Sequence, residues 1–151
     1  MDEELLYTAA LAGSLKLSAH GEWLHEGRPI GHPRIREYLF RHIEWHEPSR
    51  QYRLRFGKGA ATFTCEDTAF FVADFRDDGS RIILTLSDGS EETLVIDSLT
   101  IGAAEQIYCT VKNGHRARFL RGAHQSLLTH AVSDTELQLS GRTVRIRRAS
   151  K

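Results

Sequence analysis

The chain has 151 residues, of which 40% are hydrophobic and 26% charged, with 3 prolines. These values are typical of one globular domain, or of two small subdomains that share a core, and they exclude a disordered or fibrous chain. No stretch approaches the ~20 consecutive apolar residues of a membrane span, and residues 1–4 are acidic where a secretory signal is basic. We therefore expect a cytoplasmic protein without a membrane span.

The formal net charge of zero hides an uneven distribution. Residues 1–111 carry 11 Lys+Arg and 18 Asp+Glu, a net charge of −7, whereas residues 112–151 carry 9 and 2, a net charge of +7. Such a polarity can mark an anion-binding or partner-docking surface. Alternatively, the two parts of the chain attract each other.

The first 50 residues predict a subdomain of one strand and one helix. Residues 15–23 alternate in hydrophobicity, which indicates a half-buried strand before a turn at residues 27–30. Pro33 is suited to the first turn of a helix, and Ile35, Leu39 and Ile43 follow on one face. We expect this helix to end near Pro48.

Residues 51–151 predict an antiparallel strand meander, then a late helix and a C-terminal hairpin. The helix is expected at residues 115–131, because apolar residues recur there at helical spacing, and the hairpin at residues 136–147. The fold class is therefore α+β with two main helices. The expected strands of the meander are residues 52–56, 61–65, 70–75, 82–86, 92–96 and 106–111.

The residues that most often bind metals predict structural roles. Cys65 and Cys109 lie in strand-like runs, where a small buried and unreactive thiol is expected. His42 and His46 have the i, i+4 spacing of a helical zinc site, but the metalloprotease motif needs Glu directly after the first His. We predict no metal site and no cofactor.

The sequence also shows no complete catalytic centre. Glu66 and Asp67 are adjacent carboxylates, but strand alternation would point them to opposite faces, so a strand end and turn is the stronger interpretation. There is no Gly-rich phosphate loop, no nucleophile elbow and no paired Cys-x-x-Cys.

Two groups of arginines favour an anion-binding function. Arginine forks suit carboxylates and phosphates, and a helix N-terminus adds free N–H donors. The alternative is a solvated surface that pairs with the acidic part of the chain. A pI near 7.1 argues against nucleic acid. The two groups are Arg116, Arg118 and Arg121 at the predicted start of the late helix, and Arg142, Arg145, Arg147 and Arg148 in the tail.

Four stretches in order along the chain resemble the bacterial family called domain of unknown function 1285. They are Gly21 to Ile30 (GEWLHEGRPI), Cys65 to Val72 (CEDTAFFV), Val111 to Arg121 (VKNGHRARFLR), and Ser140-Gly141 before the closing strand.

Other positions depart from the family pattern. Ala69 stands where proline is typical, Lys112 where arginine is usual and Arg116 where an acidic residue is common. His124 and Gln125 replace frequent aromatics. The resemblance is thus to a divergent member.

The resemblance implies an α+β fold of two structurally similar motifs, the second superficially like a pleckstrin-homology domain. It also implies a ligand site between the two parts and a link to signalling, with no established reaction. The matching site residues are Trp23, Arg28, Glu66, Asp67, Arg118 and Arg121.

Three hypotheses follow. In the first, the protein is a non-catalytic binding or signalling module: Arg118 and Arg121, with Arg28, hold a small anionic ligand. Trp23 and Phe70 add apolar contact, and Glu66 or Asp67 orients an arginine.

In the second hypothesis, the chain is a protein-interaction adaptor or self-associates, because its basic tail hairpin adds an edge strand or docks an acidic partner. The third, an enzyme of unrecognised type, requires a perturbed carboxylate or histidine near Glu66, Asp67 or His25.

Overall fold

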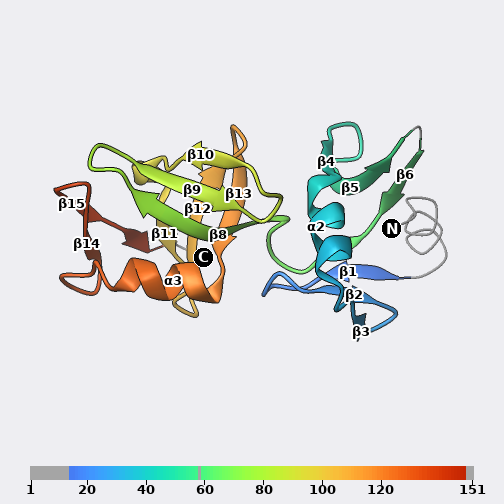
Figure 1. Ribbon diagram of the computed structural model, residues 1–151, viewed down its shortest axis with the longest axis horizontal. Coiled ribbons are helices and arrows are strands. Elements are labelled where there is room, and N and C mark those ends of the chain that lie inside the picture. The colour runs from blue at the N-terminus through green and yellow to red at the C-terminus, as the bar shows by residue number, and fades with distance from the viewer. Residues whose placement is uncertain (1–13, 58, 149–151) are drawn as a thin grey trace. The chain divides into compact units, whose positions relative to one another are not determined.

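The chain divides into two compact units, Met1–Ala69 and Phe70–Lys151. The structure, a computed structural model, describes residues 14–57 and 59–148. Each unit has its own sheets (Figure 1). The predicted boundary at residue 50 lies too early, because the strands between residues 51 and 65 pair with strands of the first unit.

The first unit contains one helix and two sheets. Its four-stranded sheet has the order β3-β2-β1-β7, and its three-stranded sheet the order β4-β5-β6. All pairs are antiparallel except β1 with β7. The elements are β1 (Leu15–Leu17), β2 (Trp23–His25), β3 (Arg28–Pro29), α2 (Pro33–Arg41), β4 (Ile43–His46), β5 (Gln51–Phe56), β6 (Gly59–Thr62) and β7 (Thr64–Cys65).

The single strand expected over residues 15–23 is a hairpin of β1 and β2. The Ser18 hydroxyl oxygen accepts hydrogen bonds from the backbone N–H groups of His20 and Glu22, at 3.2 and 3.1 Å. Gly21 has φ +82°, which glycine adopts without strain. These features turn the chain back, so that Trp23 pairs with Leu17.

Helix α2 begins as predicted but ends earlier. His32 caps it, since its Nδ1 accepts a hydrogen bond from the Arg34 N–H at 3.2 Å, and Pro33 follows in the first turn. The helix ends at Arg41 instead of near Pro48, because residues 43–46 form β4. There Trp45 lies opposite Tyr52 on β5, an aromatic cross-strand pair that a helix could not make.

The second unit is built on a seven-stranded sheet with the order β10-β9-β8-β13-β12-β11-β16. Two antiparallel meanders, β8-β9-β10 and β11-β12-β13, meet where β8 and β13 pair in parallel. The elements are β8 (Phe70–Asp77), β9 (Ile82–Leu86), β10 (Glu91–Thr93), η1 (Ile96–Ser98), β11 (Thr100–Ile101), β12 (Ile107–Val111), β13 (His115–Phe119), α3 (Arg121–Leu128), β14 (Glu136–Leu139), β15 (Arg142–Arg145) and β16 (Arg147–Arg148).

The α+β class, with mostly antiparallel strands and two helices, is confirmed. The strands do not form one continuous meander, because the two meanders join in parallel. The tail hairpin of β14 and β15 forms as expected. Neither α2 nor α3, nor any other helix in the described residues, has the length and apolarity that a membrane span needs.

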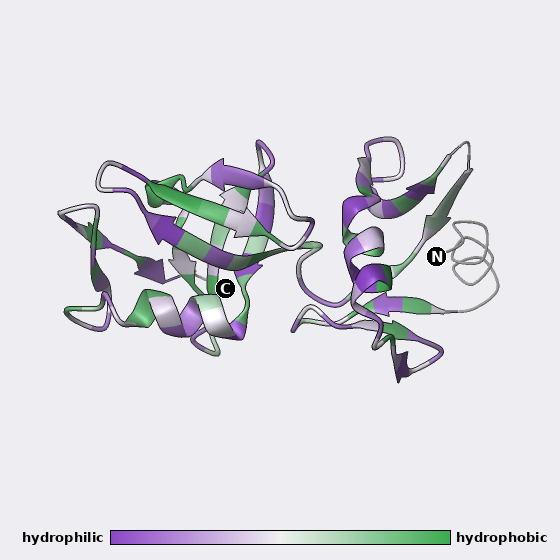
Figure 2. Cartoon of the chain, in the orientation of Figure 1, coloured by the Kyte–Doolittle hydropathy of each residue, from purple (hydrophilic) through white to green (hydrophobic). Residues whose placement is uncertain are grey.

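The late helix is shorter than predicted, because residues 115–119 form strand β13. Ala117 and Phe119 are buried there, and both β12 and β8 supply partners for the backbone. Helix α3 starts at Arg121 and packs Ala123 and Leu127 into the core beside β8 (Figure 1). Figure 2 shows hydrophobic and hydrophilic residues alternating along part of β5, whereas β9 is largely hydrophobic.

Candidate functional site

The residues predicted for the ligand site belong to both compact units. Trp23, Arg28, Glu66 and Asp67 lie in the first unit, and Phe70, Arg118 and Arg121 lie in the second. A site shared between the two units therefore stays a prediction, and the two groups are described separately.

In the first unit, Trp23 is a core residue and Glu66 has a local partner. The Trp23 side chain is fully buried, and its ring lies 5.4 Å from that of Phe40 and 5.1 Å from that of Phe63. Glu66 pairs with Lys16 at 2.9 Å, and this contact holds the pKa of Glu66 below its usual value. Arg28 is exposed on β3, and Asp67 follows β7.

In the second unit, Arg118 and Arg121 lie on different elements. Arg118 is on strand β13, where Arg116 also lies, and not in a helix as predicted. Arg121 is the first residue of α3, and the residue before it, Leu120, provides no side-chain cap. Phe70 is buried at the start of β8.

The histidine pair is not a helical metal site. Because α2 ends at Arg41, His42 lies at its C-terminal cap and His46 lies on β4. His42 Nδ1 lies 2.7 Å from the Tyr38 carbonyl oxygen, and His46 Nδ1 lies 2.7 Å from the Ser49 hydroxyl. Within the described residues, no three His, Cys, Asp or Glu side chains are grouped to hold a metal ion.

A pocket of about 640 Å³ lies in the first unit, between residues of its two sheets. We call it the aromatic pocket because Trp45, Tyr52 and Phe63 line it, each half-buried. Leu15 on β1 and Cys65 on β7 also line it. The size is within the range of roughly 300–1,000 Å³ that small-molecule sites occupy.

The rings of the aromatic pocket are held by contacts at its rim. The Trp45 and Tyr52 rings meet edge to face with centroids 4.9 Å apart. Trp45 Nε1 donates a hydrogen bond to Glu47 Oε2 at 3.0 Å, which fixes the indole on β4. The rings therefore form one wall of the aromatic pocket.

Arg50 is the one charged residue among the described residues that line the aromatic pocket. Its guanidinium lies 6.0 Å from the Trp45 ring centroid, and its ion pair with Glu47 is long, at 3.5 Å. The side chains of this pair are 77% and 72% exposed, so water weakens the attraction. Arg50 also has φ +52°, a left-handed conformation that non-glycine residues rarely adopt and that recurs at binding sites.

The other titratable groups of the aromatic pocket are neutral at pH 7. Burial raises the pKa of the Tyr52 phenol, and it raises the pKa of the Cys65 thiol to about 11. A protonated thiol is a poor nucleophile, and a protonated phenol cannot act as a base. The described lining is thus suited to binding, with Arg50 as its positive group.

The sequence does not predict this pocket. The predicted helix includes Trp45, because it continues to Pro48, and Tyr52 lies in a strand of the other predicted subdomain. A signal was present, because Trp45 and Tyr52 stand at matched positions on either side of the turn at residues 47–50. Phe63 and Cys65 reach the pocket through the parallel pairing of β1 with β7.

Comparison of the sequence with models of known families and with curated proteins finds no match. Among solved structures, the fold is similar to a DUF1285 family protein from Silicibacter pomeroyi, with TM-score 0.67, 17% identity, and coverage of 88% of this chain and 79% of that one. A DUF1285 family protein from Shewanella baltica is similar with TM-score 0.60, 14% identity, and coverage of 78% and 91%. At these identities the likeness concerns the fold, and it confirms the resemblance at that level.

Proposed function

We propose that this chain, which has the fold of the DUF1285 proteins, is a divergent member of that family and a non-catalytic binding module for a small organic anion. The ligand lies in the aromatic pocket of the first unit. One observation carries the proposal: three half-buried aromatic rings and one arginine surround a single cavity.

The rings favour a ligand with a flat apolar body. Aromatic faces that remain partly exposed in the folded protein lose contact with water when such a body stacks on them. Trp45 and Tyr52 already meet at 4.9 Å, so little ordering of these side chains is needed on binding. The Phe63 ring packs on the buried Trp23 ring, with the two ring centroids 5.1 Å apart.

The charge of the lining favours an anion. Arg50 supplies a planar set of donors that suits a carboxylate, and no acidic residue belongs to the described lining. Glu47 contacts the same guanidinium at 3.5 Å, a distance that a bound carboxylate could improve on. Trp23, which the resemblance marked, contributes to this site through Phe63. A signalling role stays a prediction.

Calorimetric titration of the full chain tests the proposal with two probes of opposite charge, 2-naphthoate and 2-naphthylmethylamine. We expect naphthoate to bind with a dissociation constant of about 1 mM or lower, and the amine to bind at least tenfold more weakly. Arg50→Gln should weaken naphthoate binding about tenfold. Arg36→Gln, which removes an exposed arginine of α2, is the matched control and should leave binding unchanged.

Three results would overturn the proposal. The two probes bind equally tightly, the Arg50→Gln variant binds naphthoate as tightly as the wild type does, or naphthoate does not bind at concentrations up to 10-fold above the expected dissociation constant. If naphthoate binding is lost in the Arg118→Ala, Arg121→Ala double variant instead, the anion site lies at the start of α3, as predicted from the sequence.

A second candidate function is association through the tail hairpin. Strand β15 pairs only with β14 among the described residues, and Arg142 and Arg145 on it are exposed without an ion pair there. Such an edge can accept another strand or an acidic partner. Deleting residues 134–151 would be a poor test, because Leu137, Leu139 and Ile146 are buried.

The charge-reversed variant Arg142→Glu, Arg145→Glu is the better test, because both side chains are exposed and the fold should be kept. Sedimentation velocity of the full chain at 50 and 500 mM salt should show self-association that salt and this variant both reduce. A monomer at all concentrations, together with no capture of an acidic peptide, would rule out this function.

A further inference from the structure

A second cavity, of about 400 Å³, lies in the second unit along helix α3. We call it the α3 groove. Its apolar part consists of Ile101 and Ile107, which are buried, and of Leu128 and Ala131. Leu128 is 50% exposed, which is unusual for a leucine on a helix that packs on a sheet. A ligand in the groove would cover this side chain.

One basic residue of the α3 groove is already neutralised. Arg148 on β16 donates two hydrogen bonds to Glu105, from Nη1 to Oε2 at 2.9 Å and from Nη2 to Oε1 at 3.1 Å. This two-pronged contact satisfies the Glu105 carboxylate and occupies the guanidinium edge that an anionic ligand would need. Arg148 is therefore a poor anion receptor in this arrangement.

A carboxylate at the same groove remains available. Asp134 lines the cavity and makes no hydrogen bond or ion pair with the described residues, although it lies close enough to Arg148 for the two charges to interact. His124 lines the groove too, and burial, aided by the charge of Arg118, lowers the pKa of its imidazole. The charged residues of the described lining are thus Glu105, Asp134 and Arg148, a formal net charge of −1.

We propose that the α3 groove is a second binding site, which takes a small amine with a compact aliphatic body. The ammonium group pairs with Asp134, and the hydrocarbon packs on Ile101, Ile107 and Leu128. This site lies within the second unit and does not depend on the aromatic pocket. The α3 groove and the aromatic pocket prefer ligands of opposite charge. The aromatic pocket has the positive Arg50, whereas the α3 groove has the carboxylate of Asp134, which makes no ion pair with the described residues.

Heteronuclear NMR titrations of the full chain test this proposal with a matched pair of probes, cyclohexylamine and cyclohexanecarboxylate, at pH 7.5. The amine should produce saturable shifts at the amides of Ile101, His124, Leu128 and Asp134, with a dissociation constant in the millimolar range. The carboxylate should bind at least tenfold more weakly.

Two variants locate the site. Asp134→Asn keeps the size of the side chain and should weaken amine binding about tenfold, whereas Asp97→Asn, on the exposed carboxylate of η1, should not change it. Leu128→Ser should also weaken binding while the spectrum stays that of a folded protein.

The proposal is overturned if the carboxylate binds as tightly as the amine, or if no saturable shifts occur up to 50 mM amine. It is also overturned if the Asp134→Asn variant binds as the wild type does, or if the shifts map to the first unit. Failure of naphthoate at the aromatic pocket would leave this result unaffected, so the two proposals fail independently.

Discussion

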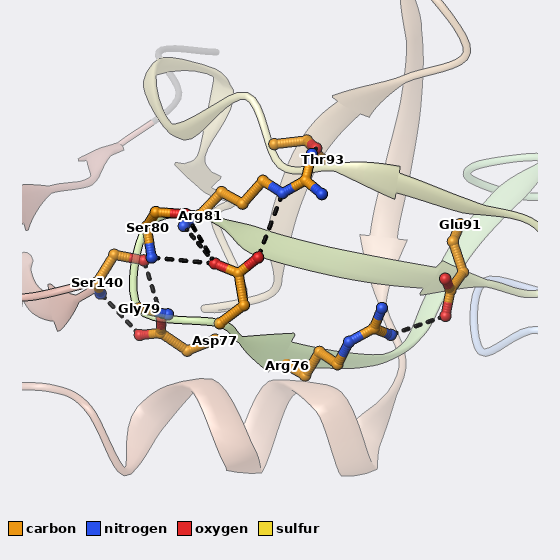
Figure 3. Close-up of polar contacts among 9 residues, drawn as sticks. Arg76, Asp77, Gly79, Ser80, Arg81, Glu91, Thr93 and Ser140 are labelled. Carbon is orange, nitrogen blue, oxygen red and sulfur yellow. Dashed lines mark hydrogen bonds and ion pairs between the residues drawn. The ribbon is translucent and has the colours of Figure 1, made fainter.

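Asp77 at the end of β8 is joined to Ser140 in the tail hairpin by two hydrogen bonds. The Ser140 backbone N–H donates to Asp77 Oδ2 at 2.7 Å, and its hydroxyl donates to Oδ1 at 2.9 Å (Figure 3). Gly79 N–H donates to Oδ1 as well, at 2.9 Å. Ser140 has φ +50° and Gly141 has φ +73°, so Asp77 holds the strained turn of the hairpin in place.

Asp77→Ala should therefore loosen the hairpin selectively. We expect amide hydrogen exchange over residues 137–145 to accelerate at least tenfold, because the turn loses both of its external bonds. Asp74→Ala is the control, since Asp74 is exposed on the same strand and, among the described residues, accepts a bond only from the next residue, Phe75. Equal protection of the hairpin in the Asp77→Ala variant and the wild type would contradict this role.

Lys112 and Asp88 form a second link, between the β12–β13 turn and the β9–β10 turn. Lys112 Nζ lies 2.6 Å from Asp88 Oδ2 and donates to Ser90 Oγ at 3.0 Å. The Asp88 side chain is only 14% exposed, so Lys112→Met would leave a largely buried carboxylate without its cationic partner. We expect a loss of about 1–3 kcal/mol in the free energy of unfolding, measured by urea denaturation.

Arg76→Met provides the control for that experiment. It breaks the Arg76–Glu91 pair, which is short at 2.8 Å but whose side chains are exposed, and its effect should be much smaller (Figure 3). If both variants lose the same stability, burial does not decide the strength of the Lys112–Asp88 link.

The same link predicts an acid-sensitive stability. Burial alone would raise the pKa of Asp88, but hydrogen bonds from Lys112 and Ser90 outweigh it and hold the pKa below its usual value. Asp88 therefore contributes stability above the unfolded pKa of about 3.9, and this contribution is lost as the pH falls through the lower folded pKa. Urea midpoints at pH 6, 4 and 2.5 should fall in the wild type. The part due to Asp88 should be smaller in Lys112→Met, where only the Ser90 hydrogen bonds remain, and an identical pH dependence in both proteins would contradict it.

The two cysteines should react slowly in the folded protein. Burial raises the pKa of Cys65 to about 11 and that of Cys109 to about 12, so at pH 8 fewer than about one thiol in a hundred is a thiolate. Reaction with an aromatic disulfide reagent, followed at 412 nm, should be much slower than after unfolding in guanidinium. A rapid phase in the folded protein would contradict this prediction. Naphthoate should slow modification at Cys65 and leave Cys109 unchanged, as peptide mapping would show.

Gly122→Ala should stabilise the protein. Gly122 is exposed in α3, an added Cβ meets no atom within 4 Å, and its φ is not in the left-handed region. Alanine is favoured over glycine in helices by about 0.5–1 kcal/mol, and thermal unfolding should show the gain. Gly79→Ala also meets open space but has φ +94°, so this control should destabilise. If both substitutions change the stability in the same direction, the argument from backbone conformation is contradicted.

Part of the candidate sites could be read from the sequence. The arginines of the tail, the strand positions of both cysteines and the exposed acidic turn at Glu66 were found from local patterns. The aromatic pocket was not found, because its rings come from β4, β5 and the segment before β7. No local sequence pattern predicts that the two sheets of the first unit will bring these rings to one pocket.

The α+β class, the start of α2 at Pro33 and most strands follow from local periods and turn residues in the sequence. The strand structure of residues 43–46 and 115–119 depends instead on long-range pairing. Ala117 and Phe119 are two residues apart, which is the period of a strand, although Phe119 also stands at helical spacing from Ala123. The backbone partners on β12 and β8 make the strand the better choice. Long-range pairing also brought Trp45, Tyr52 and Phe63 to one cavity, because contacts between distant segments depend on the whole fold and not on neighbours in the chain.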